Sequence, residues 1–88
     1  MNVLVICRMK DAADQAAFTE AVPEKSTHLR RLRGAGALVQ AWSLRGPGAV
    51  LVLEVADEAA ATEIADNLPL ASAGLIKTDL IPVSPLQL

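Results

Sequence analysis

Residues 66–85, DNLPLASAGLIKTDLIPVSP, contain the last helix end and the last strand that the sequence predicts. Pro69 follows a helix-like segment and cannot continue it, because proline lacks the amide hydrogen and clashes with the preceding turn. The run from Leu75 to Val83 is rich in aliphatic residues and predicts a strand. Pro82 and Pro85 suit a strand at the edge of a sheet, where missing donors are tolerated. The stretch therefore predicts a helix that reverses quickly into an edge strand.

One strand and one long helix begin the chain. Residues 2–9 are rich in Val, Leu and Ile and predict a strand. From Asp11, a suitable N-cap, the composition changes to residues that favour helix. Pro23 interrupts this pattern, so we expect a kink or a second helical piece there. Gly34 and Gly36 end the helix. Its apolar face carries Phe18, Ala21, Val22, Leu29 and Leu32, with Lys25 and His28 at the edges.

A hairpin and a second helix complete the order of elements. Residues 37–44 and 49–55 predict two strands joined by the turn residues 45–48. Asp57 is the expected N-cap of a short helix with one apolar face. The order βαββαβ has no internal linker and predicts a single domain over residues 1–88. It indicates an α+β, ferredoxin-like fold: a four-stranded antiparallel sheet with both helices on one face and the first and third strands in its middle.

The central strands are predicted to be apolar on both faces. In the third strand, Leu51 and Leu53 point to one side, whereas Val50 and Val52 share the other side with Glu54. An antiparallel sheet with one face in water normally alternates apolar and polar residues. The helices cover only one face, so the other face needs a partner. We therefore expect a homodimer or higher homo-oligomer that packs sheet against sheet.

Composition excludes several classes of function. The chain has a net charge of −2 and two aromatic residues, Phe18 and Trp42, so it lacks the basic field and stacking surface of a nucleic-acid-binding protein. Cys7 is its single cysteine, which rules out an internal disulfide and a cysteine-based metal cluster and fits a cytoplasmic location. By alternation Cys7 is expected to be a buried small hydrophobe. The sequence shows no signal peptide and no run of about 18 apolar residues, so no membrane association is expected.

Three residues are candidates for acid–base chemistry. Glu54 shares a strand face with valines, and a carboxylate among apolar side chains suits a general base that works near neutral pH. The alternative is that Glu54 lies at the strand end in water. Glu24 and His28 are four residues apart on the first helix, where the carboxylate can fix the imidazole tautomer. The alternative for this pair is a solvated contact at the helix edge.

Trp42 and Gln40 are candidates for binding a ligand. An aromatic side chain beside an amide can line a pocket, with the indole N–H as a donor. Packing in the core or in a dimer explains Trp42 equally well. The alternation of the second strand places four residues on one face: Leu38, Gln40, Trp42 and Leu44.

Arg8 is the candidate for binding a substrate carboxylate. It ends the first strand, next to the predicted last strand, where Lys77 and Asp79 come within its reach. An Arg8–Asp79 ion pair is the structural alternative, and such pairs are commoner than anion sites at strand ends.

Residues 68–85, LPLASAGLIKTDLIPVSP, resemble the C-terminal segment of muconolactone isomerase-like proteins, in which a helix ends in Leu-Pro-Leu and the next strand closes with a proline. The same passage also resembles YCII-like proteins. Both families belong to the dimeric α+β barrel group, in which two ferredoxin-like units pack their sheets face to face. The resemblance implies a cofactor-independent isomerase of small organic acids or lactones. The alternative is a non-catalytic protein on the same scaffold that binds a small molecule or assembles with itself.

The residue matches behind this resemblance are incomplete. Muconolactone isomerase-like chains have an acidic residue in the first helix, a tryptophan in the second strand and a following arginine, which correspond here to Glu24, Trp42 and Arg45. YCII-like chains pair a histidine, here His28, with an aspartate that precedes the proline matching Pro69. That position is Leu68 in this chain, so the acid–base pair is broken. A monooxygenase on this scaffold fits poorly, because the chain has few aromatic and histidine residues.

Overall fold

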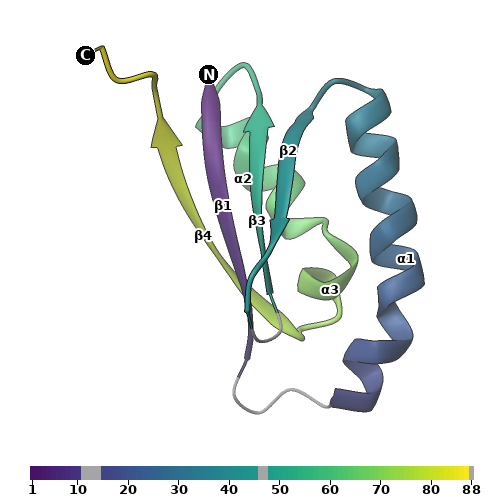
Figure 1. Ribbon diagram of the computed structural model, residues 1–88. Coiled ribbons are helices and arrows are strands. Elements are labelled where there is room, and N and C mark those ends of the chain that lie inside the picture. The colour runs from purple at the N-terminus through teal and green to yellow at the C-terminus, as the bar shows by residue number, and fades with distance from the viewer. Residues whose placement is uncertain (11–14, 46–47, 88) are drawn as a thin grey trace.

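A computed structural model describes the backbone of residues 1–10, 15–45 and 48–87, and the side chains of those residues except 15–22 and 24 (Figure 1). The elements follow the predicted order with one addition, α3. They are β1 (Asn2–Met9), α1 (Gln15–Gly34), β2 (Leu38–Ser43), β3 (Gly48–Glu54), α2 (Glu58–Asp66), α3 (Pro69–Ser72) and β4 (Ile76–Val83).

The four strands form one antiparallel sheet in the order β2-β3-β1-β4. The first and third strands therefore lie in the middle, as the sequence predicted, and the proline-containing β4 lies at an edge. All the helices lie on one side of the sheet (Figure 1). This arrangement is the α+β, ferredoxin-like fold expected from the order of elements.

Helix α1 runs without interruption through Pro23. The hydroxyl of Thr27 donates a hydrogen bond of 3.1 Å to the Pro23 carbonyl, within the turn that follows the proline. The helix ends at Gly34, and Gly36 then adopts a φ of 80°, a conformation that glycine reaches without steric cost. The expected N-cap, Asp11, lies outside the described residues.

The α2–α3 region confirms one expectation and corrects another. Asp57 caps α2 as predicted, since its Oδ1 accepts a hydrogen bond of 2.8 Å from the Ala60 amide. Helix α2 ends before Pro69, but the chain does not reverse at once into the last strand. Pro69 instead begins α3, because proline is tolerated in the first turn, where no intrahelical amide donor is required.

The inner face of the sheet supplies most of the core. Directly opposed pairs across β1 and β3, such as Val3 with Leu53 and Val5 with Leu51, are buried beneath the helices. Strand β2 departs from the predicted alternation, because a bulge shifts its register between Leu38 and Gln40. Leu38 is thereby buried opposite Leu53, whereas Gln40 and Trp42 pair with Val52 and Val50, whose side chains point to the outer face. The expectation that all these β2 residues share one face was wrong for Leu38.

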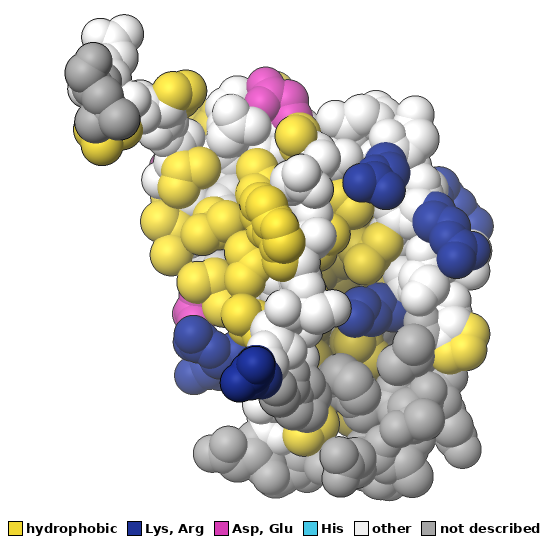
Figure 2. Space-filling model, viewed as in Figure 1, with side chains coloured by type: hydrophobic (Ala, Val, Ile, Leu, Met, Phe, Trp, Pro, Cys, Tyr) yellow, Lys and Arg dark blue, Asp and Glu magenta, His cyan; other side chains and the backbone are white. Residues whose placement is uncertain are grey.

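The outer face of the sheet is apolar and no described helix covers it. Figure 2 shows hydrophobic side chains gathered over this face, while charged side chains lie toward its margins. Trp42 is 53% exposed there. The other apolar residues of this outer sheet face are Leu4, Ile6, Val50, Val52, Ile81 and Val83.

Leu53 is the residue on which we expect the fold to depend most strongly. Its side chain is fully buried at 0% exposure, so Leu53→Ala should lower the free energy of unfolding by about 2–5 kcal/mol through lost burial and a residual cavity. Urea denaturation followed by circular dichroism measures this change. Leu86→Ala is the control, because Leu86 is 81% exposed, and it should change stability by less than about 0.5 kcal/mol. Equal effects of the two substitutions would contradict the core assignment.

Candidate functional site

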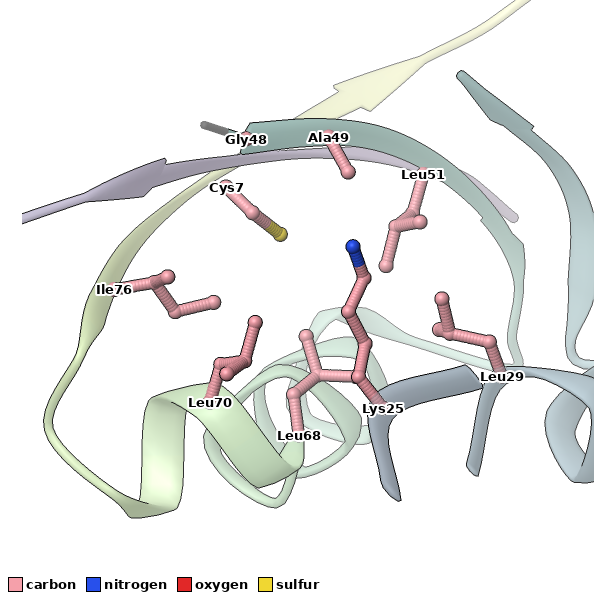
Figure 3. A pocket seen from close by; sticks show the side chains of 9 residues that line it. All are labelled: Cys7, Lys25, Leu29, Gly48, Ala49, Leu51, Leu68, Leu70 and Ile76. Carbon is pink, nitrogen blue, oxygen red and sulfur yellow. The ribbon is translucent and has the colours of Figure 1, made fainter. Parts of the chain in front are cut away.

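A pocket lies between the inner face of the sheet and the helices α1 and α3 (Figure 3). The sheet forms its roof in this view, and side chains from the helical layer close it from the opposite side. Strands, helices and the connecting segments all contribute to it: Cys7, Lys25, Leu29, Gly48, Ala49, Leu51, Leu68, Leu70 and Ile76.

Lys25 brings the only charge to the described lining of this pocket. It is half-buried, and Figure 3 shows its amine end reaching from α1 toward the sheet, between Cys7 and Leu51. The position follows from helical geometry, because Lys25 is four residues before Leu29 and seven before Leu32 and so shares their inward face. An ammonium group with apolar neighbours attracts anions more strongly than the same group in water.

Cys7 supplies the second polar group of the lining. Its side chain is buried, as the sequence predicted. Burial raises the pKa of the Cys7 thiol above its ordinary value of 9.0, and the nearby charge of Lys25 offsets part of that increase. The thiol is therefore protonated at neutral pH, where it acts as a weak proton donor and not as a nucleophile.

The pocket is narrow with Lys25 in this position. Its cavity volume is about 20 Å³, which is room for about one water molecule. Gly48 lines the pocket where β3 begins, and a side chain is excluded at this position because a Cβ would lie only 2.5 Å from the carbonyl oxygen of Cys7. A ligand larger than water needs the flexible Lys25 side chain to move toward the pocket mouth.

His28 lies at a different place, in a surface hollow of about 380 Å³ between α1 and α3. Its described lining consists of Pro23, Thr27, His28, Arg31 and Pro69. His28 and Pro69 thus line one hollow, but the position that the YCII-like resemblance pairs with His28 is Leu68. Leu68, which stands where those proteins have an acid, is buried in the apolar pocket. The side chain of Glu24 lies outside the described residues, so the predicted Glu24–His28 contact stays a prediction.

Glu54 is tied to the N-terminus at the end of the sheet. Its Oε1 lies 3.4 Å from the Met1 ammonium, and its Oε2 accepts a hydrogen bond of 2.6 Å from the Asn2 amide. The carboxylate is exposed, which matches the alternative that Glu54 sits at the strand end in water. A catalytic role for Glu54 stays a prediction.

The three predicted ligand-binding residues lie on the outer side of the sheet, away from the pocket. Gln40 and Trp42 project from β2 onto the outer sheet face. Arg8 is exposed on β1, opposite Lys77 of β4, and its guanidinium is 4.0 Å from the Asp79 carboxylate. The structure therefore shows the predicted Arg8–Asp79 pair, and it does not bring these residues together with His28. Their binding roles stay predictions.

Among the described side chains of residues 1–10, 15–45 and 48–87, which exclude those of residues 15–22 and 24, no group of three or more His, Cys, Asp or Glu is placed to hold a metal ion. Within these same ranges, no helix combines the length and the apolar composition needed to cross a membrane.

Sequence reasoning missed Lys25 as a site residue. It placed Lys25 at the edge of the apolar face of α1, whereas the structure turns it into the pocket. The available signal was its spacing, since a lysine that precedes Leu29 and Leu32 by four and seven residues occupies an inward-facing position of the helix.

No protein-family model and no curated protein sequence matches the chain. Its fold is similar to the solved structure of 5-chloro-2-hydroxyhydroquinone dehydrochlorinase (TftG) from Burkholderia phenoliruptrix AC1100 in complex with 2,5-dihydroxybenzoquinone. The TM-score is 0.82 over 96% of this chain and 94% of that chain, at 15% sequence identity. At this identity the likeness shows the fold. It confirms the ferredoxin-like α+β fold expected from the sequence.

The reactivity of Cys7 tests the burial of the pocket. We expect the folded protein to react slowly with a disulfide reagent such as Ellman's reagent at pH 7, because the thiol is buried and its raised pKa keeps it protonated. The rate should increase sharply in denaturant. The raised pKa also means that the folded state holds the Cys7 proton more tightly than the unfolded chain does. The resulting contribution to the free energy of unfolding is present at lower pH and should be lost as pH rises above about 9. Equal labelling rates for folded and denatured protein would contradict this description of Cys7.

Proposed function

We propose that the protein is a cofactor-independent enzyme that moves a proton next to the carbonyl of a small organic acid or lactone, in the pocket beneath the sheet. The observation that carries this proposal is the Lys25 amine, the only charged group in an otherwise apolar described lining. Removing a proton next to a carbonyl creates an enolate, and a fixed positive charge in a poorly hydrated site stabilises that developing oxyanion. A cytoplasmic location is part of the same proposal.

The similar structure supports the proposed class of ligand. It is a complex with 2,5-dihydroxybenzoquinone, a small ring compound that carries both carbonyl and enolic hydroxyl groups. We extend this class to the present chain, whose pocket offers a cation for an enolate oxygen and aliphatic walls for a small carbon frame. Within this class of proton-transfer reactions, we propose an isomerisation.

Each proposed step requires a group that accepts the proton. His28 lies three residues after Lys25 on α1, on an adjacent part of the helix surface, and Glu24 lies four residues before His28. We propose His28, oriented by Glu24, as the proton acceptor. Glu54 is the less favoured candidate, because its carboxylate is engaged with Met1 and Asn2.

The rate of isomerisation of a small enol lactone tests the function. Purified protein should accelerate the conversion of α-angelica lactone to its conjugated isomer, followed by ultraviolet absorbance. Lys25→Met should lower the catalysed rate by about 10²–10³-fold, the loss typical of removing one oxyanion-stabilising donor. Lys77→Met is the matched control, since Lys77 is exposed on the outer side of the sheet, and it should keep the wild-type rate. The proposal would be overturned by equal rates for wild type and Lys25→Met. It would also be overturned if the protein accelerated neither the isomerisation of the lactone nor proton transfer in related oxo acids.

Binding without catalysis is the second candidate function. It is favoured by one observation: the described lining of the pocket contains no carboxylate and no imidazole. A protein of this kind would show Lys25-dependent binding of 2,5-dihydroxybenzoquinone by calorimetry, together with no acceleration of proton transfer in any substrate.

We also propose that two copies of the chain pack their outer sheet faces against each other. Apolar side chains run across the central strands from Trp42 through Val50 and Ile6, and this face has no described cover. A second copy presents the same apolar face and makes a closed, self-complementary interface. Exposed apolar surface of this kind marks an association site in a soluble protein.

The oligomeric state tests this arrangement. Light scattering should give a dimer or a larger assembly at micromolar concentration. Val52→Glu, which places a carboxylate in the centre of the outer sheet face, should give a monomer because burying that charge against a partner is unfavourable. Thr62→Lys is the control, because Thr62 is exposed on α2 at the other side of the molecule, and this variant should assemble like the wild type. A monomeric wild-type protein would contradict the proposed dimer.

A further inference from the structure

We propose that Lys25 forms a reversible covalent imine with a small oxo acid in the pocket, which makes oxo acids the preferred substrates within the class proposed above. This inference rests on the proposed function, since it names the substrate class and the bond for the same site. It assigns Lys25 a nucleophilic role in addition to its charge.

The placement of the amine supports this role. The side chain of Lys25 crosses the pocket, and its nitrogen ends beneath the strands β1 and β3 (Figure 3). No residue of the described chain hydrogen-bonds to this nitrogen or forms an ion pair with it. An amine in such surroundings is available to a carbonyl carbon, whereas an amine held by a carboxylate is not.

The volume of the cavity limits the substrate. About 20 Å³ beside Lys25 accommodates one water molecule, so only a small group reaches the end of the pocket. Since Lys25 is half-buried, the rest of the substrate has access to solvent beside its stem. A carbonyl carbon bound to the lysine nitrogen satisfies both limits once the Lys25 side chain moves toward the pocket mouth, as any ligand larger than water requires, with the short acid chain directed to solvent.

The chemical step is balanced without a further reactant. The Lys25 ammonium releases one proton, its nitrogen attacks the carbonyl carbon, and the carbonyl oxygen becomes a hydroxyl by taking up a proton. The nitrogen then releases a second proton, which the hydroxyl takes up, and the hydroxyl departs as water while the nitrogen lone pair forms the carbon–nitrogen double bond. An ammonium and a carbonyl compound thus become a protonated imine and one water. The positive charge stays on nitrogen, where it attracts the carboxylate and acidifies the adjacent C–H bond.

Cys7 is placed to assist this exchange of protons. Its thiol points into the same space as the Lys25 amine (Figure 3) and is protonated at neutral pH because burial raises its pKa. A thiol can donate a proton to the carbonyl oxygen and recover one from the lysine nitrogen, which loses two protons as the imine forms. Aliphatic neighbours such as Leu51, Leu70 and Ile76 limit the access of water and so slow hydrolysis of the imine.

The other amines of the chain provide internal comparisons. Lys10 and Lys77 are exposed, so an imine at either position is open to hydrolysis by solvent. The N-terminal amine of Met1 contacts the Glu54 carboxylate and the Val55 carbonyl. We therefore expect the imine to accumulate at Lys25 in preference to these groups.

Borohydride trapping tests the inference. Wild-type protein mixed with pyruvate and sodium borohydride should gain the mass of one reduced pyruvate adduct, and peptide mapping should place it on Lys25. Lys25→Arg keeps the positive charge but cannot form the imine, so it should show no adduct in this peptide. Lys77→Arg should be labelled at Lys25 like the wild type. The absence of an adduct, or equal labelling of Lys10, Lys25 and Lys77 in the wild type, would overturn the inference.

A second measurement separates this inference from the proposed function. Deuterium exchange of the pyruvate methyl group in D₂O, followed by NMR, reports proton transfer without trapping. Exchange by the wild-type protein with no adduct at Lys25 rejects the imine and leaves the proposed function standing. A Lys25 adduct without exchange supports the imine and rejects catalysis. An adduct and exchange that are both lost in Lys25→Arg support the two together, and circular dichroism establishes that the variant is folded.

Discussion

The pairing of β1 with β3 is the constraint on which the rest of the structure depends. Because side chains alternate across a strand, this one ladder sets both surfaces of the sheet. Toward the helices it opposes Val5 with Leu51 and Cys7 with Ala49, which places the thiol at the wall of the pocket. On the outer face it exposes the apolar surface that we propose packs against a second copy of the chain. A shift of one residue would exchange these two surfaces, so the core, the pocket and the interface have a common register.

Lys25 is where local packing and function conflict. The inward face of α1 would bury more apolar surface with an aliphatic side chain at this position, next to Leu29 and Leu32. The chain instead places an amine there, with a long stem that lies along the apolar walls while its polar end reaches the sheet. Departures from the optimal core pattern are expected at functional sites, where chemistry and packing favour different residues. This conflict is a stronger reason for proposing the pocket as a functional site than its small volume is.

The sequence predicted the elements well because their signals are local. It predicted the site poorly because a site is assembled from residues that are far apart in the sequence. Runs of aliphatic residues, the Asp57 cap and the glycines after α1 each act within a few residues, and all lie where expected. The bulge after Leu38 is different, because it depends on how β2 pairs with β3. It places Leu38 on the opposite face of the sheet from Gln40 and Trp42, with which the sequence had grouped it. Helix α3 was hidden because Pro69 signals the end of one helix and equally the start of another. Lys25 was assigned to an edge because a charged side chain is more often exposed.

The two faces of the sheet point to a division of roles among the candidate residues. Arg8, Gln40 and Trp42 project outward, so a partner that covers this face would bury Trp42 in an interface and leave it no access to a ligand in the inner pocket. Aromatic residues are common at the centre of such interfaces. Packing in a dimer is also the alternative that the sequence left open for Trp42. We then expect the proposed chemistry to come from the inner layer, where Lys25 of α1 and Cys7 of β1 line the pocket. In the described linings of the pocket and the neighbouring hollow, Lys25, Cys7 and His28 carry groups able to bind or transfer a proton. Catalysis in this small fold is therefore expected to depend on the first strand and the first helix, with assembly assigned to the opposite face.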